Sequence, residues 1–357
     1  MTKQLENHFL RMLTGSCGIN EHAGIVAAVS GGPDSMALLH LLASARKILR
    51  LELVAVWVDH GLRPTETPQE KETVAAATEK LGIPFLPKTA DVTAYAQEKH
   101  LSIEHAAREL RYAILREVAK NCSASAIAVG HTADDQAEEV LIRLLRGSGR
   151  KGLAGMSMKS GEIIRPLLRT NKQDLLAWLT QRDIPHCFDS SNNDRKFLRN
   201  RVRHELLPFL CEQFEPGIKN SLLKTADSLA VDEDLLEEMT TDAWQQVVQE
   251  EDDTLRLLRE PFRVLHPALQ RRTIEQLLWR MGSKAKYDHI LLIIEATLNG
   301  RNRSELHLSS GLRVGVFVGW LEFSYPAGHR AWRGRLLEAT PAPSVAPLAP
   351  AHRQTQG

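Results

Sequence analysis

The sequence has few cysteines, and no two of them form a close pair. Its 357 residues include only Cys17, Cys122, Cys187 and Cys211, with no C-x-x-C spacing among them. Zinc knuckles and iron–sulfur clusters typically use such close pairs, and disulfide-stabilised domains are richer in cysteine. The cysteine content therefore argues against these three classes and is typical of a protein of the reducing cytoplasm.

The sequence also lacks a membrane segment, a secretory leader and a large net charge. No apolar run approaches the roughly 20 residues of a transmembrane helix, and the N-terminal MTKQLENH is polar where a signal peptide would be apolar. Lysine and arginine number 45 against 44 acidic residues, a formal net charge of +1. We expect a cytoplasmic protein with no membrane partner, in which any binding of nucleic acid depends on local basic clusters.

The length and the apolar content predict more than one domain. A chain of 357 residues, 43% of them hydrophobic, exceeds what a single core usually holds. We predict a first domain over residues 1–214, a polar helical connector over 215–251 and a smaller α+β domain over 252–326. The Pro/Ala-rich tail, residues 327–357, has no core pattern and is expected to be disordered.

Apolar runs alternate with helical patterns in the predicted first domain. Strands are expected at 24–29, 53–58, around Phe85, at 125–130 and at 163–168, with helices at 36–42, 67–80, 91–99, 103–119 and from 133. This alternation predicts an α/β fold with a doubly wound parallel sheet, which binds ligands beyond the carboxyl ends of its strands. Polar residues follow three of these strands, at 30–32, 59–63 and 131–135. We expect them to meet at one edge of the sheet.

The smaller domain is predicted from weaker patterns. Helices are expected at 265–281 and 286–298, followed by short strands at 305–308, 312–316 and 320–323.

The first strand ends in a turn suited to phosphate binding. Its residues are Ser30, Gly31, Gly32, Pro33, Asp34 and Ser35. Glycines allow a tight turn and close approach of the backbone to a ligand, and the helix that follows directs its positive end there. A plain strand–helix turn with a serine cap is the alternative. The turn has neither Gly-Lys-Ser/Thr nor Gly-x-Gly-x-x-Gly, which argues against ordinary kinases, GTPases and dinucleotide enzymes.

Two further clusters carry charges suited to catalysis. Asp135 and Glu138 lie at i, i+3 on one face of a predicted helix start, where they could hold a magnesium ion or an ammonium group. Helix capping explains acidic residues there as well. Arg108 and Arg111 are one helical turn apart and could bind phosphate, although an exposed charged face is the simpler explanation.

Two basic segments could bind a nucleic-acid backbone. In one, five of the nine residues 195–203 are basic, after a turn rich in Ser, Asn and Asp. In the other, basic residues flank a Gly-Ser-Gly loop. The candidates for nucleic-acid binding are Arg146, Arg150, Lys151, Arg195, Arg199, Arg201 and Arg203. A solvated basic surface is the alternative for each segment.

Taken together, these segments resemble a known family. Residues 30–35 look like the PP-loop of ATP pyrophosphatases, whose fold is of the adenine-nucleotide α-hydrolase type. The chain also resembles the tRNA(Ile)-lysidine synthases, which share its motifs in the same order. The segments that carry this resemblance are residues 30–35, 58–63, 107–112, 131–138, 146–149, 164–168 and 189–208. The last of these segments is the most specific marker.

The resemblance implies a ligase that modifies the wobble cytidine of the isoleucine tRNA with a CAU anticodon. ATP adenylates the C2 oxygen of cytosine, and the ε-amine of free L-lysine then displaces AMP at C2. Residues 30–35 and His60 would bind ATP, with Mg²⁺ expected and Asp34 as its candidate ligand. Asp135 and Glu138 would bind lysine, and Arg108 or Arg111 would lie between nucleotide and lysine. A proton acceptor is also required, for which Asp135, Glu138 and His131 are candidates.

Some features depart from the family or leave alternatives open. Glu139 follows Glu138 where the family often has threonine, and the chain has no room for the family's longest C-terminal extensions. The resemblance is compatible with a homodimer. A tRNA thiolase on the same fold is the nearest alternative enzyme, although thiolases generally need paired cysteines. A non-catalytic RNA-binding protein that keeps the loop as a scaffold is the second alternative.

Overall fold

The computed structural model describes residues 2–62, 67–187, 198–251 and 254–325. The chain divides into two compact units, residues 1–233 and 234–357. The division falls within the long helix α11 (Ile218–Val247). None of the helices in the described residues combines the length and the apolar composition needed to cross a membrane.

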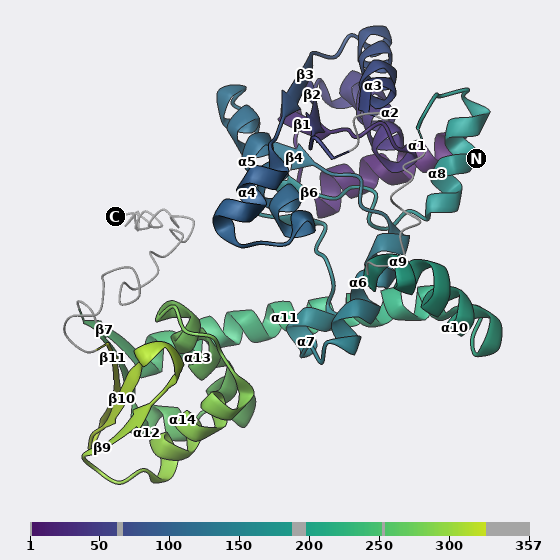
Figure 1. Ribbon diagram of the computed structural model, residues 1–357. Coiled ribbons are helices and arrows are strands. Elements are labelled where there is room, and N and C mark those ends of the chain that lie inside the picture. The colour runs from purple at the N-terminus through teal and green to yellow at the C-terminus, as the bar shows by residue number, and fades with distance from the viewer. Residues whose placement is uncertain (1, 63–66, 188–197, 252–253, 326–357) are drawn as a thin grey trace, which may run out of the picture. The chain divides into compact units, whose positions relative to one another are not determined.

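The first unit contains a doubly wound sheet, as predicted (Figure 1). Its strand order is β3-β2-β1-β4-β6-β5, and all neighbours are parallel except the edge strand β5. The strands are β1 (Gly24–Ala28), β2 (Glu52–Asp59), β3 (Phe85–Thr89), β4 (Ala126–Ala128), β5 (Lys159–Ser160) and β6 (Ile163–Ile164). The strand order reverses between β1 and β4, and doubly wound sheets bind their ligands at such a point.

Helices cover both faces of this sheet. The helices of this unit are α1 (Thr2–Arg11), α2 (Pro33–Leu49), α3 (Thr67–Leu81), α4 (Val92–Lys99), α5 (Ile103–Asn121), α6 (Ala133–Leu145), α7 (Arg150–Leu153), α8 (Lys172–Gln181), α9 (Leu198–Arg201) and α10 (Leu207–Gln213); of these, α1, α2, α3 and α8 pack on one face of the sheet and α5 on the other. Two π-helical turns, η1 (Met12–Ser16) and η3 (Val202–Leu206), complete the list. The sequence patterns had not predicted α1, α7, α8 or α10.

Alternate residues of each strand enter different cores. Ile25 and Ala27 pack with α2 and α8 on one face, whereas Val26 packs with α5 on the other. This is the two-residue periodicity of a strand that is buried on both faces. It explains why these strands are continuous apolar runs in the sequence.

Two strands are shorter than predicted. The expected run 163–168 is a strand only at Ile163–Ile164, because the chain turns at Pro166 and the Leu168 N–H donates to the Arg165 carbonyl (3.0 Å). The run 125–130 is a strand only at Ala126–Ala128. Apolar composition marks buried segments, and it does not show where a ladder of hydrogen bonds ends.

The second unit is a small α+β structure. Its antiparallel sheet has the order β7-β8-β11-β10-β9. The strands are β7 (Val248–Glu251), β8 (Thr254–Leu258), β9 (Ser304–His307), β10 (Arg313–Val316) and β11 (Trp320–Ser324), and the helices are α12 (Arg259–Arg263), α13 (Pro267–Arg280) and α14 (Tyr287–Asn299). The predicted helical connector ends earlier than expected, because residues 248–251 form β7 instead of continuing α11. The predicted tail lies outside the described residues.

A buried arginine ties the helices of this unit to its sheet. Arg259 is 6% exposed and donates to the carbonyls of Thr297 (2.8 Å), Phe317 (3.1 Å) and Gly300 (3.2 Å). Hydrogen bonds from a charged donor are worth more than neutral ones, and loss of the donor leaves buried carbonyls unsatisfied.

Replacing Arg259 with leucine is expected to lower the free energy of unfolding of the second unit by about 3 kcal/mol. Denaturant unfolding of the full chain measures this loss. The control Arg263→Leu removes an exposed side chain that donates to the Leu298 carbonyl (2.9 Å), and it is expected to cost less than about 1 kcal/mol. Equal losses in the two variants would contradict the role given to Arg259.

Candidate active site

The loop between β1 and α2 has the geometry of an anion cradle. Gly31 has φ +88°, a conformation that favours glycine, and Gly32 is the N-cap of α2. Pro33 occupies the start of the helix, where its missing N–H costs nothing. The N–H groups of Gly31 and Gly32 have no hydrogen-bond acceptor among the residues the structure describes. They are therefore available to an anionic ligand at a helix N-terminus.

The two serines brace this loop from inside. The Ser35 hydroxyl donates to the Gly32 carbonyl (2.9 Å) and accepts from the Ser30 N–H (3.1 Å). The hydroxyls of Ser30 and Ser35 are also 3.2 Å apart. Ser35 is buried while Ser30 is exposed, so Ser35 holds the turn and Ser30 faces its open side.

The segments that follow β1 and β4 lie against each other, as expected for two of the three polar segments at the carboxyl ends of the strands. A Cβ added to Gly130, just after β4, would stand 3.2 Å from the carbonyl carbon of Asp34. A Cβ at this distance would be tighter than most such contacts, so glycine favours the close approach. This close approach places His131 and the start of α6 beside the glycine turn between β1 and α2.

The acidic pair at the start of α6 is bound by two arginines. Glu138 is 1% exposed and accepts from Arg203 Nε (2.5 Å) and Nη2 (3.0 Å) and from Arg199 Nε (3.1 Å). Asp135 Oδ1 accepts from Arg203 Nη2 (3.1 Å). Its Oδ2 caps the helix by accepting from the N–H and hydroxyl of Thr132, both at 2.9 Å. Asp135 therefore caps the helix, as the alternative explanation of acidic residues at a helix start expects. It also shares Arg203 with Glu138.

The loop and the acidic pair belong to one electrostatic cluster. Burial raises the pKa of Asp34 above its ordinary value, with the charge of Asp135 adding to the effect, while Lys172 and Arg203 oppose it. Lys172 Nζ lies 3.2 Å from Asp34 Oδ2. The Lys172 N–H also donates to Asp134 Oδ2 (2.8 Å), so this residue links the loop to α6.

Asp135 is held in its ionised form. Burial works to raise the pKa of Asp135, but Arg199, the Thr132 N–H and Arg203 together hold it below the ordinary value. Such a carboxylate is a good partner for a cation and a poor proton acceptor.

His131 is the neutral member of the cluster. Burial, together with the positive charges of Arg165, Arg199 and Arg111, lowers its pKa to about 4, against the attraction of Asp135. Its Nδ1 atom is buried and has no hydrogen-bond partner among the described residues. His131 is therefore a neutral imidazole that can accept a proton.

The two candidate arginines of α5 differ in their surroundings. Arg108 is exposed and lies over the ring of Tyr112 (5.1 Å). Arg111 is half-buried, and its Nε is buried without a hydrogen-bond partner in the described chain. Arg111 also lies over the Tyr112 ring (5.4 Å), and its positive charge is one of those that lower the pKa of His131.

The predicted nucleic-acid ligands separate into two groups. Arg199 and Arg203 bind the acidic pair instead of lying free on the surface, whereas Arg146, Arg150, Lys151 and Arg201 are exposed. Arg150 pairs with Asp232 (2.9 Å) and Arg201 with Glu205 (3.7 Å). Arg195 lies outside the described residues.

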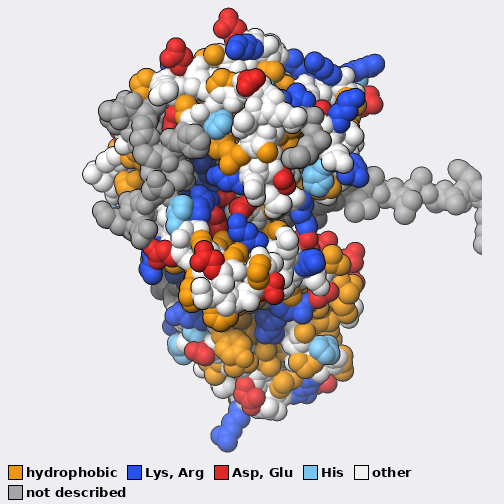
Figure 2. Space-filling view, turned by 90° about the vertical axis from the view of Figure 1, so that its right-hand side faces the viewer, with side chains coloured by type: hydrophobic (Ala, Val, Ile, Leu, Met, Phe, Trp, Pro, Cys, Tyr) orange, Lys and Arg blue, Asp and Glu red, His pale blue; other side chains and the backbone are white. Residues whose placement is uncertain are grey.

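His60, a candidate ATP-binding residue, follows β2 at the same sheet edge. In the space-filling view, basic and acidic side chains lie together in a hollowed part of one face (Figure 2).

Sequence reasoning missed Lys172 and Lys219. Lys219 Nζ binds Asp134 Oδ1 (2.8 Å), so Asp134 accepts from both lysines. The signal for Lys172 was available, because it follows the last parallel strand just as the other candidate residues follow theirs. Lys219 lies on α11, and no local pattern connects it to α6.

Known proteins provide an independent comparison. The model of the PP-loop domain family matches residues 1–210. A tRNA(Ile)-lysidine synthase of Geobacter sulfurreducens is 37% identical over 300 residues, which cover 81% of this chain and 62% of that protein. One of Geobacillus kaustophilus is 35% identical over 308 residues, covering 83% and 65%. The chain therefore spans slightly less than two thirds of the length of these relatives.

A solved structure agrees on the fold. The U34-tRNA thiolase of Methanococcus maripaludis, solved with its 4Fe–4S cluster, matches with a TM-score of 0.52 at 19% identity, over 64% of this chain and 80% of that one. The glycine turn at the switch point of the sheet and the match over more than half the chain lead to the same assignment: the chain belongs to the PP-loop domain family.

Proposed function

We propose that this chain is a tRNA(Ile)-lysidine synthase, a cytoplasmic ligase that joins free lysine to the wobble cytidine of the isoleucine tRNA with a CAU anticodon. The observation that carries the proposal is that Lys172 links the glycine turn to the start of α6: its Nζ lies 3.2 Å from Asp34 Oδ2, and its N–H donates to Asp134 Oδ2 (2.8 Å), one residue before Asp135. A nucleotide bound at the turn and an amine bound at the pair would then share one site. The identity to relatives of that name supports the substrate assignment.

The reaction has two steps in one site. The C2 oxygen of cytosine attacks the α-phosphorus of ATP, the bond to diphosphate breaks, and the cytidine becomes adenylated. The ε-amine of lysine then attacks C2, the bond from C2 to the AMP oxygen breaks, and the attacking nitrogen loses a proton. The first step creates the leaving group that the second step needs.

The glycine turn would hold the phosphates of ATP. Its backbone N–H groups, the Ser30 hydroxyl and the N-terminus of α2 supply donors, and Lys172 adds a positive charge next to Asp34. Mg²⁺ would reduce the negative charge on the phosphates. Asp34 fits as its protein ligand, because its Oδ1 is buried and has no partner in the described residues. One carboxylate with substrate phosphates is an ordinary ligand set for this ion.

Asp135 and Glu138 would bind the side chain of lysine. All four of their carboxylate oxygens already accept hydrogen bonds from Arg203, Arg199 or Thr132. A lysine ammonium must therefore share these oxygens or displace a guanidinium. We infer that Arg199 and Arg203 hold the acidic pair in place until substrate arrives.

His131 is the best candidate for the proton acceptor. Asp135 and Glu138 are committed to cations, whereas His131 is neutral and has a buried, unpartnered Nδ1. After the amine has attacked C2, its nitrogen carries a positive charge and its protons become acidic. A weakly basic imidazole is then sufficient to accept one.

Arg201 represents the exposed basic residues that would bind the tRNA backbone. Its side chain is 60% exposed, and its Glu205 partner is 3.7 Å away. We expect Arg201→Ala to weaken tRNA binding and to reduce the slope of log K against log salt by about one unit. Filter binding across a salt series measures this. The control Arg116→Ala removes another exposed, ion-paired arginine, on α5, and should leave the slope unchanged; an unchanged slope for Arg201→Ala would exclude a phosphate contact.

One assay tests the proposed function. Purified protein is incubated with ATP, labelled lysine, and transcripts of the isoleucine and methionine tRNAs. Label is expected only in the isoleucine transcript, with release of AMP and diphosphate. Incorporation of sulfur would favour a tRNA thiolase, and RNA binding without transfer by folded protein would favour a non-catalytic role.

A further inference from the structure

The loop that follows α6, residues 146–156, folds back along this helix and contains α7 (Figure 1). At the end of α6, the Ser148 N–H donates to the Arg143 carbonyl (2.9 Å). Near the start of α6, the Met156 N–H donates to Gln136 Oε1 (2.8 Å). The loop therefore follows about 10 Å of the helix, from residue 143 back to residue 136. It ends beside Asp135, the first residue of the acidic pair.

Gln136 fastens the far end of this loop. It is 4% exposed, and its amide donates to the Met156 carbonyl (3.0 Å) while accepting from the Met156 N–H. Gly155 makes room for this amide, because its φ is +72° and a Cβ there would stand 2.5 Å from Gln136 Nε2. One side chain that pairs with both backbone groups of a residue holds that residue as a neighbouring strand would.

Arg143 fastens the middle of the loop. Its Nη1 donates to the carbonyls of Gly152 (2.8 Å) and Gly155 (2.9 Å). Its Nε donates to Glu139 Oε1 (2.7 Å), which fixes the guanidinium in place. Hydrogen bonds from a charged donor are stronger than neutral ones, so Arg143 restrains the loop more than a neutral side chain would.

The helix α6 thus serves two purposes on two faces. Gln136, Glu139 and Arg143 lie at i, i+3 and i+7 and hold the loop. Asp135 and Glu138 lie at i and i+3 on another face and bind the arginines of α9 and η3. The loop and the acidic pair are therefore attached to the same rigid element.

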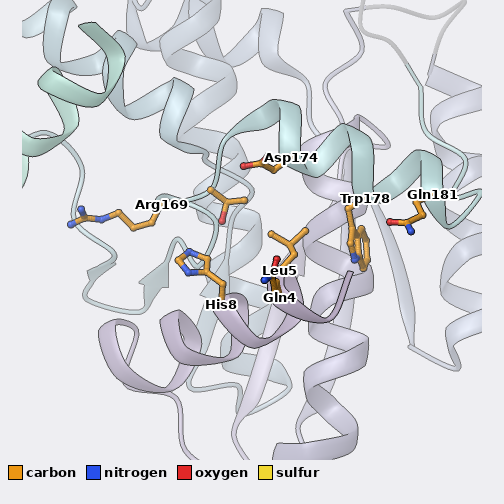
Figure 3. Close-up of a pocket in the computed structure, with 8 residues that line it drawn as sticks. Gln4, Leu5, His8, Arg169, Asp174, Trp178 and Gln181 are labelled. Atoms are coloured by element: carbon orange, nitrogen blue, oxygen red, sulfur yellow. The ribbon is translucent and has the colours of Figure 1, made fainter. Parts of the chain in front are cut away.

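The charge of the loop is entirely positive. Residues 146–156 contain Arg146, Arg150 and Lys151, all exposed, and no acidic residue. Arg150 pairs with Asp232 (2.9 Å), but an exposed pair of this kind contributes little, and a phosphate can replace the carboxylate. The cavity of about 320 Å³ between α1 and α8 has no described residue of the loop in its lining (Figure 3). The loop is thus suited to an extended polyanion on the surface.

We propose that Gln136 and Arg143 are positioning residues for the tRNA, an inference that rests on the proposed function. By fixing the loop to α6, they set the distance between the phosphates that the loop binds and the acidic pair. Lysine transfer requires C2 of the wobble cytidine to meet the amine, and a displacement of about 1 Å can slow such a step about 100-fold. A loop anchored to the helix that holds the lysine limits this displacement.

Filter binding of the tRNA in the absence of lysine tests the role of Arg143. Arg143→Met keeps the apolar stem and removes the donors. We expect it to weaken tRNA binding about tenfold and to reduce the slope of log K against log salt by about two units, because a loosened loop loses phosphate contacts. ATP affinity should stay within about threefold. The control Arg116→Met removes an arginine that also donates to a carboxylate at 2.7 Å, that of Glu162, and should change neither the affinity nor the slope.

The decisive comparison repeats the change in a variant whose loop carries no charge. In this background Arg146, Arg150 and Lys151 are replaced by glutamine. If Arg143 acts by placing these side chains, Arg143→Met should alter tRNA affinity less than about twofold there. Equal losses in the two backgrounds would overturn the proposal. Thermal unfolding and ATP binding confirm that each variant is folded.

Gly155→Ala tests the same attachment without removing a charge. Its Cβ would displace the Gln136 amide, so we expect hydrogen exchange at the Met156 amide to become about tenfold faster and tRNA binding to weaken as in Arg143→Met. Gly161→Ala is the matched control, since Gly161 also has a positive φ (+58°) but has open space at the Cβ position. Faster exchange with unchanged tRNA affinity would show that the attachment is only structural and would refute the inference. Failure of the wild type to bind the tRNA would reject the proposed function itself, and this inference with it.

Discussion

Replacing Glu138 with glutamine is expected to lower kcat/KM for lysine at least 100-fold while changing ATP affinity less than about threefold. Glu138 is 1% exposed, and both its oxygens accept from arginines. Under the proposed function, this buried carboxylate lies where the lysine ammonium would bind. Removing one charge of a buried, hydrogen-bonded set costs about 3–5 kcal/mol, which is equivalent to a loss of 100-fold or more. Steady-state lysine incorporation and equilibrium ATP binding measure the two parameters.

The same change could act by destabilising α6, so a control is required. Glu139→Gln removes the neighbouring carboxylate, which pairs mainly with Arg143 (2.7 Å) and lies 3.8 Å from Arg199. We expect this variant to retain lysine use within about threefold. Thermal unfolding of both variants separates loss of substrate binding from loss of fold. A parallel loss of lysine use and ATP affinity in Glu138→Gln would show that the acidic pair has only a structural role.

The sheet of the first unit could be predicted because burial on both faces leaves a clear trace in the sequence. Ile25, Val26 and Ala27 belong to two different cores, so the strand has to be apolar throughout. Helices α1 and α8 also carried a signal. Leu5, Phe9 and Leu13 repeat every four residues, and Leu175, Trp178 and Leu179 follow helical spacing. These helices were missed because their apolar stripes are short and their other faces are polar.

The meeting of residues after β1 and β4 at one edge of the sheet could be predicted, but the pairing of the charged side chains there could not. The carboxyl ends of parallel strands meet at one edge, so residues after β1 and β4 had to lie close together. Nothing local in the sequence shows that Arg199 and Arg203 turn toward Glu138, which lies 61 and 65 residues away. A basic segment that binds phosphate and one that neutralises buried carboxylates have the same composition. Only tertiary structure distinguishes them.

The pairing also changes the assignment of chemical roles within the cluster. Before the geometry is known, Asp135, Glu138 and His131 are equivalent candidates for accepting a proton from the amine. In the structure both carboxylates pair with Arg203, and although burial works to raise the pKa of Asp135, Arg199 and Arg203 help to hold it below its ordinary value. His131 is surrounded by positive charge and stays neutral. Under the proposed function, the acidic pair would hold the lysine and His131 would accept its proton.

His131→Asn is expected to slow lysine transfer about 100-fold and to leave adenylation within about threefold of the wild-type rate. Asparagine keeps polarity and approximate size but cannot accept a proton at neutral pH. Single-turnover measurements separate the two steps, by following diphosphate release for adenylation and labelled lysine in tRNA for transfer. The control His40→Asn changes another half-buried histidine whose pKa burial lowers, on α2. It should affect neither step.

The pH dependence provides a second test of the same role. The pKa of His131 in the folded protein is about 4, so the imidazole is in its accepting form at every pH above that value. An unfolded histidine titrates near 6.5, so between about pH 6.5 and 4 the unfolded chain binds a proton that the folded chain does not, and acidification destabilises the fold. From pH 8 to pH 6 the transfer rate should fall only as the neutral fraction of lysine amine falls, about tenfold per unit. An additional loss with an apparent pKa near 6.5 in the wild type, or equal losses in both steps for His131→Asn, would exclude His131 as the proton acceptor.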